Sequence, residues 1–212
     1  MTDQLTLFGA KGSGAVAVEA ALTLIGAPYR LVEAYTWDHD DPASGDQVLA
    51  ANPMRQVPAL VLAGGEAITE SAAILTWLAE TYPAARLAPL PGDPGRGQFL
   101  RWMSFVSSAI YSLYWVKDDP SRLVPDPAGH AALTERTLER IAACWGIMDT
   151  QVTPGAYILG DELSVLDLYV AVVSRFRPRR ERFYREAPKM AACVKRVDED
   201  PRLEAFWAAR MG

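Results

Sequence analysis

The sequence predicts an α/β domain followed by an all-α domain, and three observations support this fold class. The first 82 residues contain short apolar strand patterns that alternate with helical patterns. A segment rich in proline and glycine follows at residues 83–97 and reads as a linker. Beyond it only helical patterns appear. We therefore expect one domain at residues 1–82 and a second at residues 98–212.

The first domain is expected to begin with a buried strand at residues 5–8. A Gly/Ser loop and a helix ending at Gly26 follow, and residues 28–33 form a second strand. A strand–helix–strand unit of this kind is parallel and right-handed. Residues 59–62 and 66–69 predict a hairpin around Gly64 and Gly65, and residues 71–82 an amphipathic helix.

The second domain is expected to contain helices at residues 98–117, 128–150, 165–175, 187–199 and 203–210. Most aromatic residues of the first of these helices are assigned to the core by their spacing. Tyr111, Tyr114 and Trp115, near its end, are candidates for the wall of an apolar pocket. The basic run at residues 175–185 is interpreted as solvated residues at a helix end.

Composition argues against several classes of function. The net charge of −5 disfavours a general nucleic-acid or anionic-membrane surface. No apolar run reaches 18 residues and no basic-then-apolar leader opens the chain, so we expect a cytoplasmic protein. The only histidines are His39 and His130, and Cys144 and Cys193 lie far apart, so no metal site is expected.

The stretch NPMRQVPALVLAGGEAITES, at residues 52–71, combines three binding features. Val57 and Pro58 stand where a loop enters a strand, and the backbone groups of Val57 can pair with an extended, peptide-like ligand. Glu70 and Ser71 stand at the start of a helix, where N–H groups favour a carboxylate and the Glu70 side chain suits an ammonium group. The stretch therefore predicts a site for a charged, peptide-like ligand.

These motifs resemble those of the cytosolic glutathione S-transferases. The order NPxxxVPAL, then ES with AAIL and WL, then a proline-rich linker and helices, is similar to that family over essentially the whole chain. The segment YILGDELSVLDL, from residue 157, resembles the family's capping box. Ser164 can cap a backbone N–H while the Asp167 carboxylate accepts from the Ser164 N–H, so both residues are assigned a structural role.

The resemblance implies a thioredoxin-like first domain that binds glutathione and a helical-bundle second domain with an electrophile pocket and homodimer contacts. Val57 would hold the cysteinyl amide of glutathione through its backbone, with Pro58 cis, and Gln56 would reach the glycyl or backbone groups. Glu70 would bind the γ-glutamyl ammonium and Ser71 its carboxylate. Two alternatives stay open: Val57 simply packs in the core, and Ser71 only caps a helix.

The catalytic position is expected after the first strand, where the family has Tyr, Ser or Cys. Ser13 is the only hydroxyl between Phe8 and the helix, so it would donate a hydrogen bond to the glutathione thiolate as in serine-type bacterial members. The alternative is that Ser13 is only the N-cap of that helix. Many relatives have Ser-Pro ahead of this loop where this chain has Ala10 and Lys11, so the alignment can shift by one residue.

The expected function is that of a glutathione transferase with a role in detoxification. The activated thiol would attack an electrophilic small molecule by substitution or addition, with glutathione as co-substrate and no other cofactor. Two rivals share the site: a glutathione-binding or protein-interaction module without turnover, and an enzyme of glutathione-dependent reductive or dehalogenating chemistry.

Overall fold

The computed structural model describes residues 4–37 and 40–211, so His39 lies outside the described residues. The chain divides into two compact units. Unit 1 comprises Met1–Ala88 and Asp198–Gly212, and unit 2 comprises Pro89–Val197. The structure thus has the expected fold class, a sheet domain with helices followed by a helical domain.

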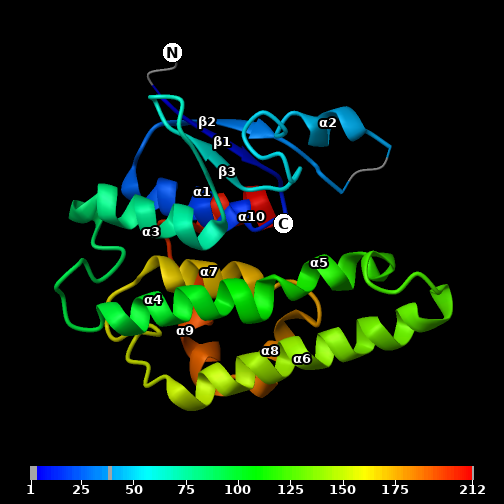
Figure 1. Cartoon of the computed structure of the whole chain (residues 1–212). Coiled ribbons are helices and arrows are strands. Elements are labelled where there is room, and N and C mark those ends of the chain that lie inside the picture. Colours follow the sequence, from blue (N-terminus) through cyan, green and yellow to red (C-terminus); the bar gives the residue numbers. More distant parts are fainter. Residues whose placement is uncertain (1–3, 38–39, 212) are drawn as a thin grey trace. The chain divides into compact units, whose positions relative to one another are not determined.

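Unit 1 is built on a four-stranded sheet in the order β2-β1-β3-β4 (Figure 1). β1 (Leu5–Gly9) runs parallel to β2 (Tyr29–Glu33), and α1 (Ala15–Ile25) connects them. β3 (Ala59–Val61) is antiparallel to both β1 and β4 (Ala67–Thr69). The predicted strand–helix–strand unit and hairpin are confirmed.

Helices cover the sheet because its inward-facing residues are apolar. α1, α3 (Ser71–Thr81) and α10 (Glu204–Met211) lie on the same side of the sheet, and α1 contacts both others (Figure 1). α1 ends at Gly26, which adopts a φ of 72° as the sequence led us to expect for a helix stop. The short α2 (Pro42–Asp46) lies between β2 and β3 in the chain.

The chain between Pro89 and Val197, unit 2, is helical in its regular structure. Its elements are α4 (Arg96–Phe105), a π-helical segment η2 (Val106–Tyr111), α5 (Leu113–Asp118), two short 3-10 turns (Pro120–Arg122 and Pro127–Gly129), α6 (His130–Gln151), α7 (Val165–Val173), α8 (Arg179–Glu186) and α9 (Pro188–Asp198), which runs one residue past the unit.

Two elements of unit 2 differ from the sequence expectation. The helix expected at residues 98–117 is divided by the π-helical segment, in which hydrogen bonds span five residues instead of four and shift the helix register. The basic run at residues 175–185 is not only a helix end, because most of it forms α8. Phe183 anchors this charged helix: it is buried, and its ring meets that of Trp145 on α6 edge to face with centroids 5.1 Å apart.

The domain limits also differ from the expected ones. Residues after 198, which the sequence analysis places in the second domain, belong to unit 1, where α10 packs on α1. The physical reason is an ion pair inside unit 1, in which Arg210 of α10 donates to the buried carboxylate of Glu19 at 2.9 Å. The first part of the expected linker also belongs to unit 1 and contains the 3-10 turn η1 (Pro83–Ala85).

The predicted capping box is confirmed at the start of α7. Asp167 is fully buried, and its Oδ2 accepts from the N–H and the hydroxyl of Ser164 at 2.9 and 2.7 Å. Its Oδ1 accepts from the Ile158 N–H at 2.8 Å, so the carboxylate also fixes the preceding loop. Burial raises the pKa of Asp167 to about 6. Both residues act on local backbone, as expected.

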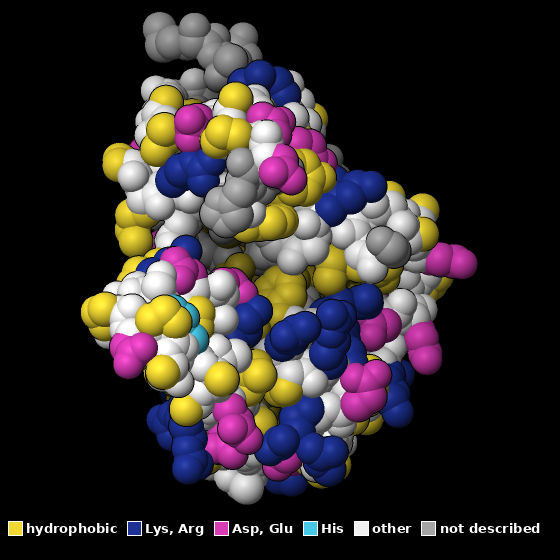
Figure 2. Space-filling model, turned by 90° about the vertical axis from the view of Figure 1, so that its right-hand side faces the viewer, with side chains coloured by type: hydrophobic (Ala, Val, Ile, Leu, Met, Phe, Trp, Pro, Cys, Tyr) yellow, Lys and Arg dark blue, Asp and Glu magenta, His cyan; other side chains and the backbone are white. Residues whose placement is uncertain are grey.

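The surface is mixed in charge. Figure 2 shows Lys and Arg side chains interspersed with Asp and Glu on the face that it displays. None of the helices in the described ranges is long and apolar enough to cross a membrane.

Candidate functional site

Strand pairing brings the predicted glutathione residues to one edge of the sheet. Ala59, the first residue of β3, pairs with Phe8 of β1 on one side and with Thr69 of β4 on the other. Both neighbours run antiparallel to β3, so their C-terminal ends lie beside the N-terminal end of β3. The loop after β1, the residues before β3 and the residues after β4 therefore meet there. Ser13, Val57 with Pro58, and Glu70 with Ser71 occupy these three segments.

The segment before β3 leaves a backbone edge available. The Val57–Pro58 bond is cis. The Val57 side chain packs against the buried cluster of Ala34, Val48 and Ala59. The alternative that Val57 packs in the core therefore holds for its side chain. In the described part of the chain, no partner is found for the Val57 backbone N–H or carbonyl. Val57 can therefore serve the core with its side chain and a ligand with its backbone.

Asn52 shapes the loop that leads to Val57, a role the sequence analysis missed. The residue is buried, with 5% of its surface exposed. Its Nδ2 donates to the Gln56 carbonyl at 2.9 Å, and its Oδ1 accepts from the Met54 N–H at 3.1 Å. The loop is thus held by its own amide side chain, and Gln56 lies beside the available backbone of Val57.

Ser71 presents a buried hydroxyl that lacks a partner. It is the first residue of α3 and is 4% exposed, and its Oγ forms no hydrogen bond with any described residue. Leaving such a group unpaired costs about 1–3 kcal/mol. A capping hydroxyl would accept from a first-turn N–H, so the helix-cap alternative is not supported. The hydroxyl and the N-terminal N–H groups of α3 together suit a carboxylate.

Glu70 precedes this hydroxyl in an uncommon backbone conformation. It has a φ of 68°, is exposed, and makes no capping bond to α3 with its side chain. Positive φ in a residue other than glycine costs on the order of 1–3 kcal/mol and clusters at ligand sites. The exposed carboxylate at this position is available to an ammonium group.

Ser13 is buried, but its hydroxyl has partners. Its Oγ donates to the Ala10 carbonyl at 2.7 Å and accepts from the Ala15 N–H at 3.2 Å. Gly14 holds the N-cap position of α1, so Ser13 lies one residue before it yet still satisfies a first-turn N–H. Donation to a ligand therefore requires the Ser13 hydroxyl proton to leave the Ala10 carbonyl.

In unit 2 two of the three predicted pocket residues come together. Tyr111 and Tyr114 meet edge to face with centroids 5.9 Å apart. Tyr169 of α7 and Phe176 complete the cluster: Phe176 stacks on Tyr111 at 5.9 Å and meets Tyr114 at 5.5 Å. Trp115 is 43% exposed and instead stacks with the guanidinium of Arg122.

Tyr169 and Phe176 have no distinctive sequence signal, because the first lies in an apolar helix pattern and the second in the basic run. Three tyrosines of this aromatic cluster carry hydroxyls, and that of Tyr114 lies among the residues predicted from sequence. This hydroxyl is buried and has no partner within the described ranges, and burial raises its pKa. The Tyr114 hydroxyl therefore stays protonated at neutral pH and can donate a hydrogen bond.

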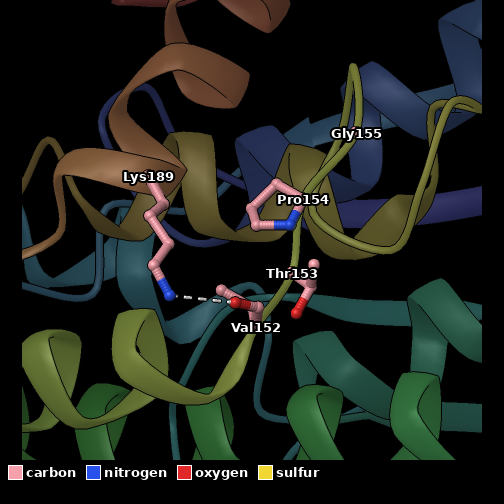
Figure 3. Close-up of a pocket in the computed structure, with 5 residues that line it drawn as sticks. All are labelled: Val152, Thr153, Pro154, Gly155 and Lys189. Carbon is pink, nitrogen blue, oxygen red and sulfur yellow. Dashed lines mark hydrogen bonds between the residues drawn. The ribbon is translucent and has the colours of Figure 1, made fainter.

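A separate concavity in unit 2 does not contain any predicted site residue (Figure 3). It has a volume of about 330 Å³ and is lined by Val152, Thr153, Pro154, Gly155 and Lys189. Lys189, its only charged lining residue, donates to the Val152 carbonyl at 3.2 Å. Across residues 4–37 and 40–211, no group of three or more His, Cys, Asp or Glu side chains is arranged to hold a metal ion.

Comparison with known proteins agrees with both units. Residues 15–81 match the family model of the glutathione S-transferase N-terminal domain, and residues 125–210 that of the C-terminal domain. An uncharacterized GST-like protein of Escherichia coli (strain K12), YncG, is 29% identical over 94% of this chain and 95% of its own length. The maleylacetoacetate isomerase of Rattus norvegicus is 33% identical over 73% of this chain and 68% of its own.

A solved crystal structure has a similar fold over the whole chain. That of a glutathione transferase homologue from Sulfitobacter with bound glutathione aligns over 100% of both chains, with a TM-score of 0.85 and 26% identity. The two domain matches, in this order, cover most of the chain. The protein belongs to the glutathione S-transferase family.

Proposed function

We propose that the protein is a glutathione transferase with a serine-type active site. The observation that carries the proposal is the unpartnered, buried Ser71 hydroxyl at the start of α3. It lies at the same sheet edge as the available backbone of Val57. An extended peptide with a carboxylate and an ammonium at one end fits this set of groups. The glutathione bound to the Sulfitobacter homologue supports this choice of ligand.

In this proposal each group binds one part of glutathione. The Val57 N–H and carbonyl pair with the cysteinyl unit of glutathione. Ser71 and the N-terminal N–H groups of α3 bind the γ-glutamyl carboxylate, and Glu70 binds the ammonium. Gln56 reaches the glycyl end or the peptide backbone.

Ser13 would activate the thiol. A thiol with a pKa near ~8.5 is only a few per cent ionised at neutral pH, and each unit by which its pKa falls requires about 1.4 kcal/mol of preferential binding to the thiolate. One hydroxyl donor to a charged acceptor supplies roughly 1.5–3 kcal/mol. The Gly14 and Ala15 N–H groups, at the start of α1, would assist.

The second substrate would be an apolar electrophilic small molecule. Tyr111 and Tyr114 form an aromatic wall with Tyr169 and Phe176, which suits a flat or unsaturated compound. The Tyr114 hydroxyl can donate to an acceptor atom on it. Trp115 contributes an exposed ring at the rim. The reaction would be substitution or conjugate addition.

Location, oligomeric state, biological role and cofactor use are proposed from the resemblance to the family. The protein would act in the cytoplasm as a homodimer, with a role in detoxification, and glutathione would be a co-substrate with no further cofactor.

One observation favours a second candidate, a glutathione-binding module without turnover. The Ser13 hydroxyl is already engaged with the Ala10 carbonyl, whereas the Ser71 hydroxyl is not engaged. The Ser71 hydroxyl, which would bind glutathione, is thus available, while the Ser13 hydroxyl, which would activate the thiol, is engaged. The two candidates share glutathione binding and differ in whether the thiol pKa falls.

Calorimetric titration with glutathione and a spectroscopic pH titration of the bound thiol separate the candidates. Ser71→Ala should weaken binding at least tenfold, about 1.4 kcal/mol. Ser13→Ala should preserve binding and raise the bound thiol pKa. The control is Ser108→Ala, which removes an exposed hydroxyl that bonds only within its own helix.

Each outcome has a definite meaning. Absence of glutathione binding by the wild type would refute the ligand. An unshifted thiol pKa in the wild-type complex would select the binding module. A lowered thiol pKa that Ser13→Ala leaves unchanged would remove Ser13 from the catalytic role.

A further inference from the structure

Arg55 stands in the middle of the loop that precedes Val57, in a conformation that normally favours glycine. Its φ is 54°. For a residue with a Cβ atom this left-handed region costs roughly 1–2 kcal/mol. Such a cost persists only where the surroundings hold the residue in place. The Arg55 N–H donates to the Asn52 carbonyl at 2.9 Å, but the side chain makes the contacts that distinguish this residue.

All three nitrogens of the Arg55 guanidinium donate to the segment that follows β2. Nη1 donates to the Thr36 carbonyl at 2.6 Å and Nη2 to the Pro42 carbonyl at 2.9 Å. Nε donates to Oδ1 of Asp46 at 2.7 Å. The acceptors belong to the loop after β2 and to α2, so one planar guanidinium joins the loop before β3 to a segment 9 to 19 residues earlier in the chain.

Gly45 makes room for this guanidinium. A Cβ atom on Gly45 would stand 2.7 Å from Cζ of Arg55 and 3.0 Å from Cα of Thr36. Both distances are shorter than ordinary contacts, so a larger residue at 45 would displace the guanidinium. Gly45 does not have a positive φ, so its small size, not its backbone freedom, is what the contact needs. Arg55 thus supplies the guanidinium, and Gly45 leaves the space that the guanidinium occupies.

The direction of these bonds assigns a role to Arg55. A basic residue in a loop that binds a tripeptide with two carboxylates would ordinarily be a candidate ligand contact. Here each nitrogen of the guanidinium already donates to a protein acceptor, so three of its five N–H groups are used within the protein. These three bonds hold the guanidinium against the segment after β2, and through them Arg55 acts on the loop.

We propose that Arg55 is a positioning residue that holds the loop at 52–58 in the form that binds glutathione. This inference rests on the proposed function. Residues 47–58 contain no helix or strand, so the loop depends on side-chain ties for its order. Asn52 makes side-chain hydrogen bonds within the loop, and Arg55 makes the hydrogen bonds that join the loop to the segment after β2. If the loop is already ordered before glutathione arrives, binding does not include the entropic cost of ordering it.

Three variants isolate the tie. Arg55→Gly removes the side chain and also the backbone strain, so any loss of binding cannot be attributed to a strained loop. Arg55→Lys keeps the charge but loses the planar fork with its three directions. Gly45→Ala keeps Arg55 but displaces its guanidinium. Glutathione affinity is measured by calorimetry, and amide hydrogen exchange of residues 52–58 is measured without ligand.

We expect Arg55→Gly and Gly45→Ala each to weaken glutathione binding about tenfold and to speed amide exchange in the loop. The double variant should be no weaker than either single one, because both remove the same tie. Arg55→Lys should fall between wild type and Arg55→Gly. The KM for the electrophile and the thiol pKa of the saturated complex should not change, as they would in a general loss of structure.

Three results would overturn the proposal: unchanged affinity and exchange in Arg55→Gly, additive losses in the double variant, or full affinity in Arg55→Lys. The last would mean that charge alone matters. If wild type fails to bind glutathione, the proposed function is wrong, and the exchange experiment still decides whether Arg55 orders the loop.

Discussion

Removal of Arg210 should destabilise unit 1 more than removal of any exposed ion-pair partner. Arg210, on α10, joins two carboxylates of the same unit. Its Nη2 and Nε donate to Oε1 of Glu19 on α1 at 2.9 and 3.2 Å, and its Nη1 donates to Oε1 of Glu33 on β2. The Glu19 side chain is 2% exposed and that of Arg210 is 10% exposed. Arg210→Ala therefore leaves a buried carboxylate without its cation.

The expected magnitude follows from this burial. Burial raises the pKa of Glu19, and the bond and charge of Arg210 oppose that rise. Removing one partner of a buried ion pair costs about 3–5 kcal/mol. Domains have about 5–15 kcal/mol of stability in total. The control Arg136→Ala breaks a pair with Glu139 whose side chains are 81% and 49% exposed, and such pairs contribute up to about 1 kcal/mol.

The assay is urea denaturation followed by circular dichroism at several pH values. Without Arg210, the folded-state pKa of Glu19 should rise further, so the folded protein binds a proton more tightly than the unfolded chain. Stability then falls as pH rises from the unfolded pKa to the folded one. The defect of Arg210→Ala should therefore be larger above neutral pH than near the ordinary pKa of a glutamate. The double variant Glu19→Leu/Arg210→Met should recover much of the loss.

A loss no larger than that of Arg136→Ala would refute this reasoning, because it would mean that water or another group replaces Arg210. A defect that is constant with pH would refute it differently: Glu19 would then not be the group left uncompensated.

Three other predictions concern separate parts of the chain. Burial raises the pKa of Asp167 to about 6, so the free energy of unfolding of wild type relative to Asp167→Asn should fall by up to about 3 kcal/mol as pH rises through that range, measured in urea. Burial raises the pKa of Cys144, and that of Cys193 to about 11, so neither native thiol should react with an alkylating reagent at neutral pH until denaturant is added; rapid labelling of folded protein would contradict this. Gly155→Ala should cost about 1–3 kcal/mol because its Cβ would stand 2.9 Å from a backbone carbonyl, whereas Gly64→Ala, in open space, should cost much less.

The order of strands and helices along the chain was predictable because it depends on local patterns. Alternating apolar residues and the Gly26 stop predict β1, α1 and β2 within a residue or two, and the capping box at Ser164 predicts the start of α7. The meeting of three loops at one sheet edge also follows from pairing once the strands are known. Much of the candidate site was therefore accessible from sequence.

Features that depend on distant partners were not predictable. Arg210 and Glu19 are 191 residues apart, and nothing local to α10 indicates that it packs on α1. Residues 106–111 have an ordinary helical pattern, and the π-helical register appears only in the folded chain. Nothing in the sequence singles out Arg55, because its acceptors are mostly backbone carbonyls, which carry no sequence signal.

The same distinction separates the two serines on which the proposed function depends. Sequence motifs place Ser13 and Ser71 alike at the start of a helix, but only the structure shows that Ser13 has an acceptor and Ser71 has no partner. Exchanging the Ala10 carbonyl for a thiolate replaces a neutral hydrogen bond, a net contribution of about 0.5–1.5 kcal/mol, by a charged one of about 1.5–3 kcal/mol. The exchange is favourable only once a thiolate lies within reach. In the proposed function, binding through Ser71 would therefore precede activation by Ser13, and we expect weakened binding to lower turnover even where Ser13 is intact.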